Sequence, residues 1–121
     1  MVVCKTNVPQ MLMLPETHNN IFGTTDNAWD PERCAGGSSG GEGALIGVGG
    51  SALGIGTDIG GSIRIPCQFN GLVGFKPTPW RVSEEGITLP FLKEDRSGMQ
   101  AVKLTAGPMA RCVEDLALML K

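Results

Sequence analysis

The chain has 121 residues, room for one domain at most, and its 41% hydrophobic and 18% charged residues are typical of globular proteins. A net charge of −2 gives no basic surface, which excludes nucleic acid as a partner. The four cysteines are widely spaced, which argues against a metal site or a disulfide framework and favours reduced thiols in an intracellular protein. No apolar run reaches the length of a membrane span, and the N-terminus does not resemble a signal peptide.

The first half of the chain is predicted to contain a strand, a loop and a helix. The strand covers residues 2–5, and a surface loop rich in Asn, Asp and Thr covers residues 18–33. A helix is expected from about residue 41 to 49, capped by Ser39 or a neighbouring glycine, with Glu42 at the capping-box spacing. Its many glycines lower helix propensity, so tight packing must hold it.

The second half alternates strands and helices. A strand is predicted at residues 53–57, a short helix from Gly61 to about residue 70, and a strand at residues 72–76. Residues 78–105 are predicted to be mostly loop, most exposed at 94–98, and a last helix starts near Val113. This alternation predicts a layered α/β fold. Because a strand pattern opens the chain and an uncapped helix pattern ends it, residues 1–121 are expected to be part of a single domain truncated at both ends.

Two glycine-serine blocks are the main candidates for chemistry: GGSSGG at residues 36–41 and DIGGSIR at residues 58–64. In each block the glycines around the serine can adopt backbone conformations that other residues adopt only at a cost in free energy. Such a backbone can come close to a substrate and point its main-chain N–H groups at it. A serine hydroxyl is a poor nucleophile unless a neighbour removes its proton, so the pair suggests a nucleophile and its partner. Flexible linkers and structural turns are the alternatives, although the apolar flanks argue against linkers. Neither block has the Lys-Ser/Thr pair of a phosphate-binding loop.

Other polar residues are weaker candidates for partners of these serines. His18, the only histidine, lies in a loop-like context, and Lys5 and Lys76 each end a predicted strand. Asp58 is expected to hold its loop through hydrogen bonds to backbone N–H groups. Arg64 is expected to pair with a buried carboxylate such as Asp58.

Several motifs together resemble the amidase signature family. In chain order they read KTNVPQ at 5–10, GGSSGGE at 36–42, GTDIGGSIRIP at 56–66, GLVGFKPT at 71–78 and GPMAR at 107–111. The resemblance covers nearly the whole chain, and it is strongest to the fatty acid amide hydrolase branch. The features of that branch are NVPQ at 7–10, Glu42 and Ile65. The subunit of tRNA-dependent amidotransferases usually has a small residue in place of Glu42 and glutamine in place of Ile65.

The resemblance implies a Ser-Ser-Lys triad on a partial α/β/α fold with a mixed central sheet. Ser62 matches the nucleophile, and Ser38, after a cis peptide bond, matches the serine that relays the proton. The backbone N–H groups of Ile59, Gly60, Gly61 and Ser62 match the oxyanion hole, and the supporting residues are Ser39, Asp58 and Arg64. The family's catalytic lysine lies upstream of residue 1, and Lys5 and Lys76 match other positions, so the chain alone is expected to be inactive.

The implied activity belongs to a longer parent protein. It would hydrolyse a small-molecule carboxylic amide through an acyl-enzyme on Ser62, and the branch that the chain resembles most suggests a fatty acid amide. Neither a metal nor an organic cofactor is implied. Two alternatives stay open: the glutamine-hydrolysing subunit of a tRNA-dependent amidotransferase, and a truncated product without catalysis. Membrane association of the parent and homodimer formation also stay open.

Overall fold

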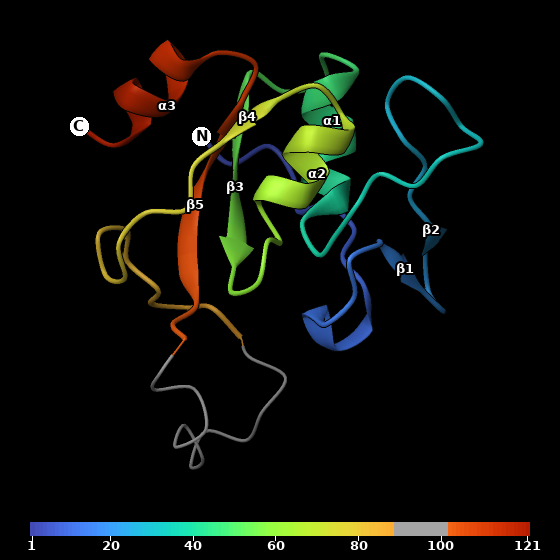
Figure 1. Cartoon of the computed structure of the whole chain (residues 1–121), viewed down its shortest axis with the longest axis horizontal. Helices are drawn as coiled ribbons and strands as arrows, with labels where there is room; N and C mark the ends of the chain where they lie inside the picture. Colours follow the sequence, from blue (N-terminus) through green and yellow to red (C-terminus); the bar gives the residue numbers. More distant parts are fainter. Residues whose placement is uncertain (89–101) are drawn as a thin grey trace.

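A computed structural model describes residues 1–88 and 102–121 (Figure 1). A short 3-10 helix at Gln10–Leu12 precedes a hairpin of β1 (His18–Asn19) and β2 (Gly23–Thr24). The remaining elements are α1 (Gly40–Gly47), β3 (Leu53–Asp58), α2 (Arg64–Phe69), β4 (Val73–Gly74), β5 (Thr105–Ala110) and α3 (Val113–Met119). Within these residues, no helix combines the length and the apolar character that crossing a bilayer requires.

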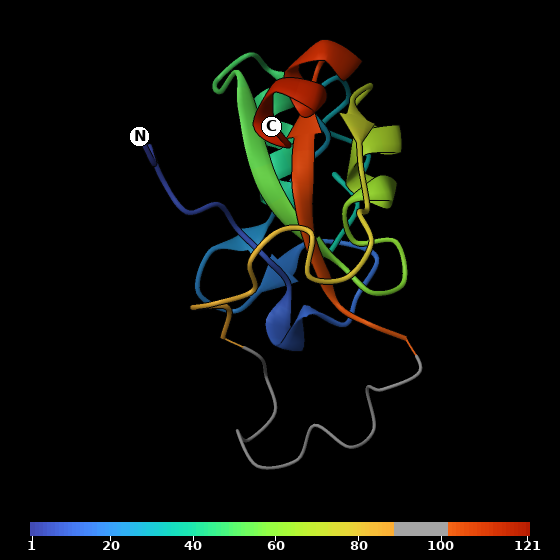
Figure 2. The same cartoon turned by 90° about the vertical axis from the view of Figure 1, so that its left-hand side faces the viewer.

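The central sheet has the strand order β3-β5-β4, and β5 pairs antiparallel with both neighbours. Figures 1 and 2 show that α1 and α2 cover one face of this sheet, while α3 lies over the opposite face. The described part of the chain is therefore a three-layer α/β/α arrangement. The predicted α/β class is confirmed, and the strand pairings among the described residues are antiparallel.

The core lies between the sheet and the two helices that cover one face. Ile46 from α1, Ile63 and Cys67 from α2 and its lead-in, and Met109 from β5 form one buried cluster. Gly74 in β4 has no room for a side chain, because an added Cβ would lie 2.5 Å from the sulfur of Cys67. The helix α2 therefore packs closely on the sheet. In α1 an added Cβ at Gly43 would lie 3.0 Å from the Cβ of Pro66, so close packing also offsets the low helix propensity of this glycine-rich helix.

Most predicted elements are confirmed, with shifts of a few residues at their ends. The helices near residues 41, 61 and 113 and the strand at 53–57 are present, while the strand at 72–76 shrinks to two residues. The predicted surface loop at 18–33 contains the short β1-β2 hairpin. Residues 94–98, which were expected to be highly exposed, lie outside the described residues.

Three expectations about secondary structure are wrong. Residues 2–5 form no strand, and their side chains are exposed. The capping box at the start of α1 does not form, because the Ser39 hydroxyl bonds to Thr57 and the Glu42 carboxylate accepts a 2.8 Å hydrogen bond from Thr6. β5 (Thr105–Ala110) was not predicted: its first residue ends the predicted loop at 78–105, and no strand was predicted for the residues that follow.

Candidate active site

The two glycine-serine blocks meet in the folded chain. The first leads into α1, and the second connects β3 to α2. The backbone N–H of Ser39 donates to the carbonyl of Ser62 over 3.1 Å. The Ser39 hydroxyl accepts a 3.2 Å hydrogen bond from the backbone N–H of Thr57. Ser39 thus ties the first block to Thr57, which directly precedes the second block, and to Ser62 within it.

The turn that carries Ser62 is organised around a buried carboxylate. The Asp58 side chain is fully buried and accepts hydrogen bonds from the backbone N–H groups of Gly61 at 2.8 Å and Ile63 at 3.1 Å. The guanidinium of Arg64 donates to both carboxylate oxygens, at 3.0 and 3.1 Å. Both geometric expectations for Asp58 and Arg64 are confirmed, and Ser62 lies between residues that this carboxylate fixes.

The environment of Asp58 keeps it ionised. Burial works to raise its pKa, but the hydrogen bonds from Arg64, Ile63 and Gly61 outweigh burial and hold the pKa of this carboxyl below its ordinary value. The same contact raises the pKa of Arg64. Charge-assisted bonds of this kind are stronger than neutral ones, so the ion pair fixes the Ser62 turn electrostatically as well as sterically.

Ser38 lies in the first block on closely packed backbone. Its side chain is 2% exposed, and the peptide bond between Gly37 and Ser38 is cis, as the resemblance implied. Gly37 has no space for a side chain, because an added Cβ would lie 2.6 Å from the carbonyl oxygen of Glu16 and 2.7 Å from that of Leu14. Glycine at this position is therefore a steric requirement of the site.

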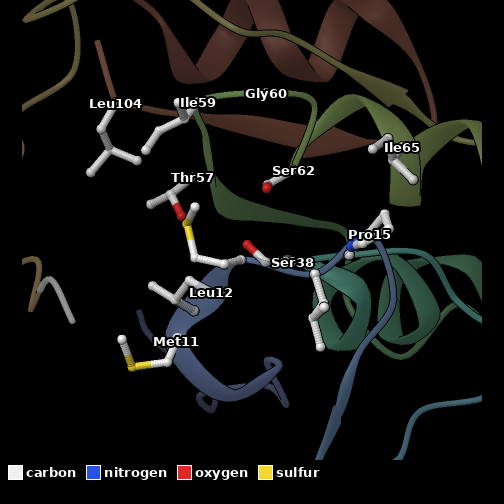
Figure 3. Close-up of a pocket in the computed structure, with 13 residues that line it drawn as sticks. Met11, Leu12, Pro15, Ser38, Thr57, Ile59, Gly60, Ser62, Ile65 and Leu104 are labelled. Carbon is white, nitrogen blue, oxygen red and sulfur yellow. The ribbon is translucent and has the colours of Figure 1, made fainter. Parts of the chain in front are cut away.

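Ser38 and Ser62 open into one pocket. Figure 3 shows both hydroxyl groups pointing into the same space. The pocket has a volume of about 270 Å³. Its other lining residues are mostly apolar and include Met11, Leu12, Met13, Leu14, Pro15, Ile59, Ile65 and Leu104. A hydroxyl pair beside an apolar cavity suits the chemistry of an apolar substrate with one reactive polar bond.

The remaining candidates lie away from this pocket. The His18 imidazole is exposed and hydrogen-bonds the Thr24 hydroxyl over 2.9 Å. Lys5 is exposed and Lys76 is half-buried, and neither lines the pocket. Among residues 1–88 and 102–121, the side chains that line the pocket include no ionisable group, and no cluster of metal-binding side chains occurs.

Sequence reasoning missed the segment that closes the pocket. Residues 11–15 read MLMLP, and all five line the cavity. The signal was a short apolar run, ended by proline, that was too short for a helix and fitted no strand alternation. Thr17, whose buried hydroxyl hydrogen-bonds the backbone of Gly36 and Gly40, was also missed, because a single threonine in a polar stretch carries no pattern.

The comparisons with known proteins find amidases that match all or nearly all of the chain. The family model described as Amidase matches residues 1–121. Fatty-acid amide hydrolase 1 of Sus scrofa is 54% identical over 116 residues, which cover 96% of this chain and 19% of that protein. Acetamidase of Aspergillus oryzae is 46% identical over 117 residues, which cover 97% of this chain and 21% of that protein. The chain thus spans about a fifth of the length of these relatives.

Solved structures of related enzymes also superpose on nearly the whole chain. A fatty acid amide hydrolase superposes with a TM-score of 0.88 at 44% identity, covering 97% of this chain and 20% of that one. The glutamyl-tRNA(Gln) amidotransferase subunit of Thermotoga maritima superposes with a TM-score of 0.84 at 36% identity, covering 99% of this chain and 25% of that one.

Proposed function

The chain belongs to the amidase signature family, and from this premise we propose that it forms the serine-bearing core of a longer amidase. One observation carries the proposal: Ser38 and Ser62 face the same apolar pocket, with the glycine turn of residues 59–61 beside them. The chain covers 19% of the fatty-acid amide hydrolase of Sus scrofa, and we propose that residues beyond these 121 complete the active protein.

In the proposed reaction, Ser62 Oγ attacks the carbonyl carbon of the amide. Its proton passes to Ser38, and Ser38 gives its own proton to a lysine outside this chain. The tetrahedral intermediate collapses by breaking the C–N bond, and the amine leaves with a proton returned along the same path. Water then attacks the acyl group on Ser62, releasing the carboxylic acid and regenerating the hydroxyl.

We assign the oxyanion of the intermediate to backbone N–H groups of the Ser62 turn. Preorganised donors at such a site are each worth roughly a hundred- to a thousandfold in rate. The N–H of Gly61 donates to Asp58 in this structure. We therefore assign the oxyanion to the N–H groups of Ile59, Gly60 and Ser62. Gly61, which the resemblance placed among these donors, holds the turn in shape instead.

The pocket lining favours an apolar amide over glutamine. Ile65, where the amidotransferase subunit usually has glutamine, lines the cavity together with the apolar run at residues 11–15. Burying apolar surface contributes about 25 cal/mol per Å², so an alkyl or acyl chain gains affinity here. Glutamine would lose hydration at its polar groups in such a lining without matching partners.

Active-site labelling tests the proposal on the full-length protein that carries these residues. A fluorophosphonate probe followed by peptide mapping should modify Ser62, and Ser62→Ala should abolish both labelling and oleamide hydrolysis. Ser51→Ala is the matched control, because the Ser51 hydroxyl donates to the carbonyl of Leu53 over 2.7 Å and Ser51 is not among the described residues that line the pocket. Modification of Ser38 or Ser39 in place of Ser62 would refute the assignment, and glutaminase activity without oleamide hydrolysis would favour the amidotransferase alternative.

A further inference from the structure

Thr17 is a buried polar residue next to the candidate site that the proposed chemistry does not use. Its side chain is fully buried, although the neighbouring Glu16 and His18 are exposed. Burying a hydroxyl without hydrogen bonds costs free energy, so its partners show what the residue does. Thr17 precedes β1 directly and lies against the block that carries Ser38.

The Thr17 hydroxyl bridges the two ends of this block. It donates to the carbonyl oxygen of Gly36 over 2.9 Å and accepts from the backbone N–H of Gly40 over 3.1 Å. The carbonyl oxygen of Ser38 lies farther away, at 3.5 Å. A hydroxyl has one hydrogen to donate, and the shorter contact to Gly36 uses it. One side chain therefore closes the turn of residues 36–40 around Ser38.

This bridge replaces the helix cap that the sequence predicted. Gly40 is the first residue of α1, and its N–H belongs to the group that has no partner within the helix. The side chain of Ser39, at the cap position, bonds to Thr57 instead. Thr17 supplies the missing acceptor from a distant part of the chain, so the start of α1 and the position of Ser38 depend on the same hydroxyl.

The backbone of Thr17 is itself held in place. Its carbonyl accepts a 2.9 Å hydrogen bond from the N–H of Thr25, which follows the β1-β2 hairpin. Gly40 packs so closely against the Thr17 side chain that an added Cβ would collide with its hydroxyl. The hydroxyl is thus fixed from both sides, as a positioning group requires.

We infer that Thr17 is a positioning residue of this site: its buried hydroxyl clamps residues 36–40 and so holds the Ser38 hydroxyl in register with Ser62. The inference rests on the proposed function, because it gives Thr17 an effect on rate only through Ser38. Small displacements of a reacting group can cost about a hundredfold in rate, so loss of the clamp has a measurable effect.

The test compares two substitutions in the full-length protein. Thr17→Val keeps the shape of the side chain and removes the hydroxyl, and it is expected to lower kcat about tenfold or more with KM within about threefold. Thr17→Ser keeps the hydroxyl and is expected to retain kcat within about threefold. Circular dichroism and thermal unfolding establish that each variant is folded. The rate of Ser62 labelling by a fluorophosphonate provides a second readout.

A double-mutant cycle separates positioning from general stability. If Thr17 acts through Ser38, then Thr17→Val slows Ser62 labelling in the wild type but has no further effect in a Ser38→Ala background. An equal loss in both backgrounds would overturn the inference, as would an unimpaired Thr17→Val. If Thr17→Val does not fold, Thr17→Ser decides: a folded serine variant that loses tenfold in kcat overturns the role of the hydroxyl. A wild type that neither hydrolyses amides nor labels at Ser62 overturns the proposed function, and this inference with it.

Discussion

At the scale of single residues, one carboxylate accounts for much of the order around Ser62. Asp58 is fully buried, yet five donors from the next six residues surround it and keep it charged. A buried charge is tolerated only when it is paired and hydrogen-bonded, and here both conditions are met within one turn. Because Gly61, Ile63 and Arg64 donate their backbone N–H groups to Asp58, the proposed mechanism leaves those of Ile59, Gly60 and Ser62 to face a ligand.

The stability of the protein should consequently depend on pH through Asp58. Its pKa is lowered on folding, so the carboxylate stabilises the fold above its unfolded pKa of about 3.9, and this contribution is lost as the pH falls through the folded value. Asp58→Asn should cost about 1–3 kcal/mol at pH 7 and flatten the acid limb of the stability curve. Denaturant unfolding at pH 7 and pH 3 measures both effects.

The control for this prediction is Asp30→Asn. Asp30 pairs with Arg33 at 2.9 Å on the surface, where both side chains are exposed, so its loss should change stability by less than about 1 kcal/mol. If Asp58→Asn and Asp30→Asn have the same effect at both pH values, the proposed role of the buried pair is wrong.

Cys67 should be chemically silent in the folded protein. Burial, with a smaller contribution from the charge of Asp58, raises the pKa of its thiol to about 12. Only about one molecule in ten thousand then carries the thiolate at pH 8, and the thiolate is the reactive form. Iodoacetamide at pH 8 should modify Cys4, whose side chain is exposed, and leave Cys67 intact until denaturant is added. Rapid native modification of Cys67 would show that the core around α2 opens readily.

At the scale of elements, the helices and β3 were predictable because their apolar and glycine patterns are local. β5 was not, because TAGPMA contains a glycine and a proline that argue against a central strand. The sheet accepts Pro108 because its carbonyl still receives a 3.0 Å hydrogen bond from the N–H of Phe75. The valines at positions 2 and 3 have strand propensity but are exposed, and tertiary pairing decides such cases.

The same division between local and non-local signals applies to the site. The two serine blocks were visible as motifs, because glycine is required wherever backbone approaches backbone. The pairing of Asp58 with Arg64 was also predictable, since the two residues are six positions apart. Thr17 and the segment at 11–15 lie about twenty residues or more along the chain from the groups they contact in the site. Only folding brings them together, so no short sequence pattern predicts these contacts.

Close packing of β5 gives a prediction at this scale. Gly107 lies opposite Gly56, and an added Cβ would collide with the carbonyl oxygen of Phe75 and lie 2.7 Å from Pro77. Gly107→Ala should therefore destabilise the protein by about 1–3 kcal/mol, since backbone cannot move aside cheaply. Gly60→Ala is the control, because among the described residues an added Cβ there meets no heavy atom of a non-adjacent residue within 4 Å. Equal melting temperatures for the two variants would contradict this packing.

At the scale of the whole molecule, the described residues bring the two serines of the proposed catalytic site to one pocket. The sheet and its covering helices fix the two serine blocks against each other, and the pocket opens beside them (Figures 2 and 3). Under the proposed mechanism, nucleophile, relay and backbone donors all come from local structure. Under the same mechanism, the group that removes a proton from the serines is not among the described side chains that line the pocket.

The isolated 121 residues are accordingly expected to show no amide turnover. A serine nucleophile without its base loses most of its rate, since the hydroxyl stays protonated at neutral pH. The chain should be expressed alone, shown to be folded by circular dichroism, and assayed against oleamide beside the full-length protein. An activity comparable to the full-length protein would contradict the expectation and direct attention to Lys5 and Lys76, which Lys5→Met and Lys76→Met would then distinguish. Loss of turnover in only one of the two variants would identify the base that the pocket geometry does not reveal.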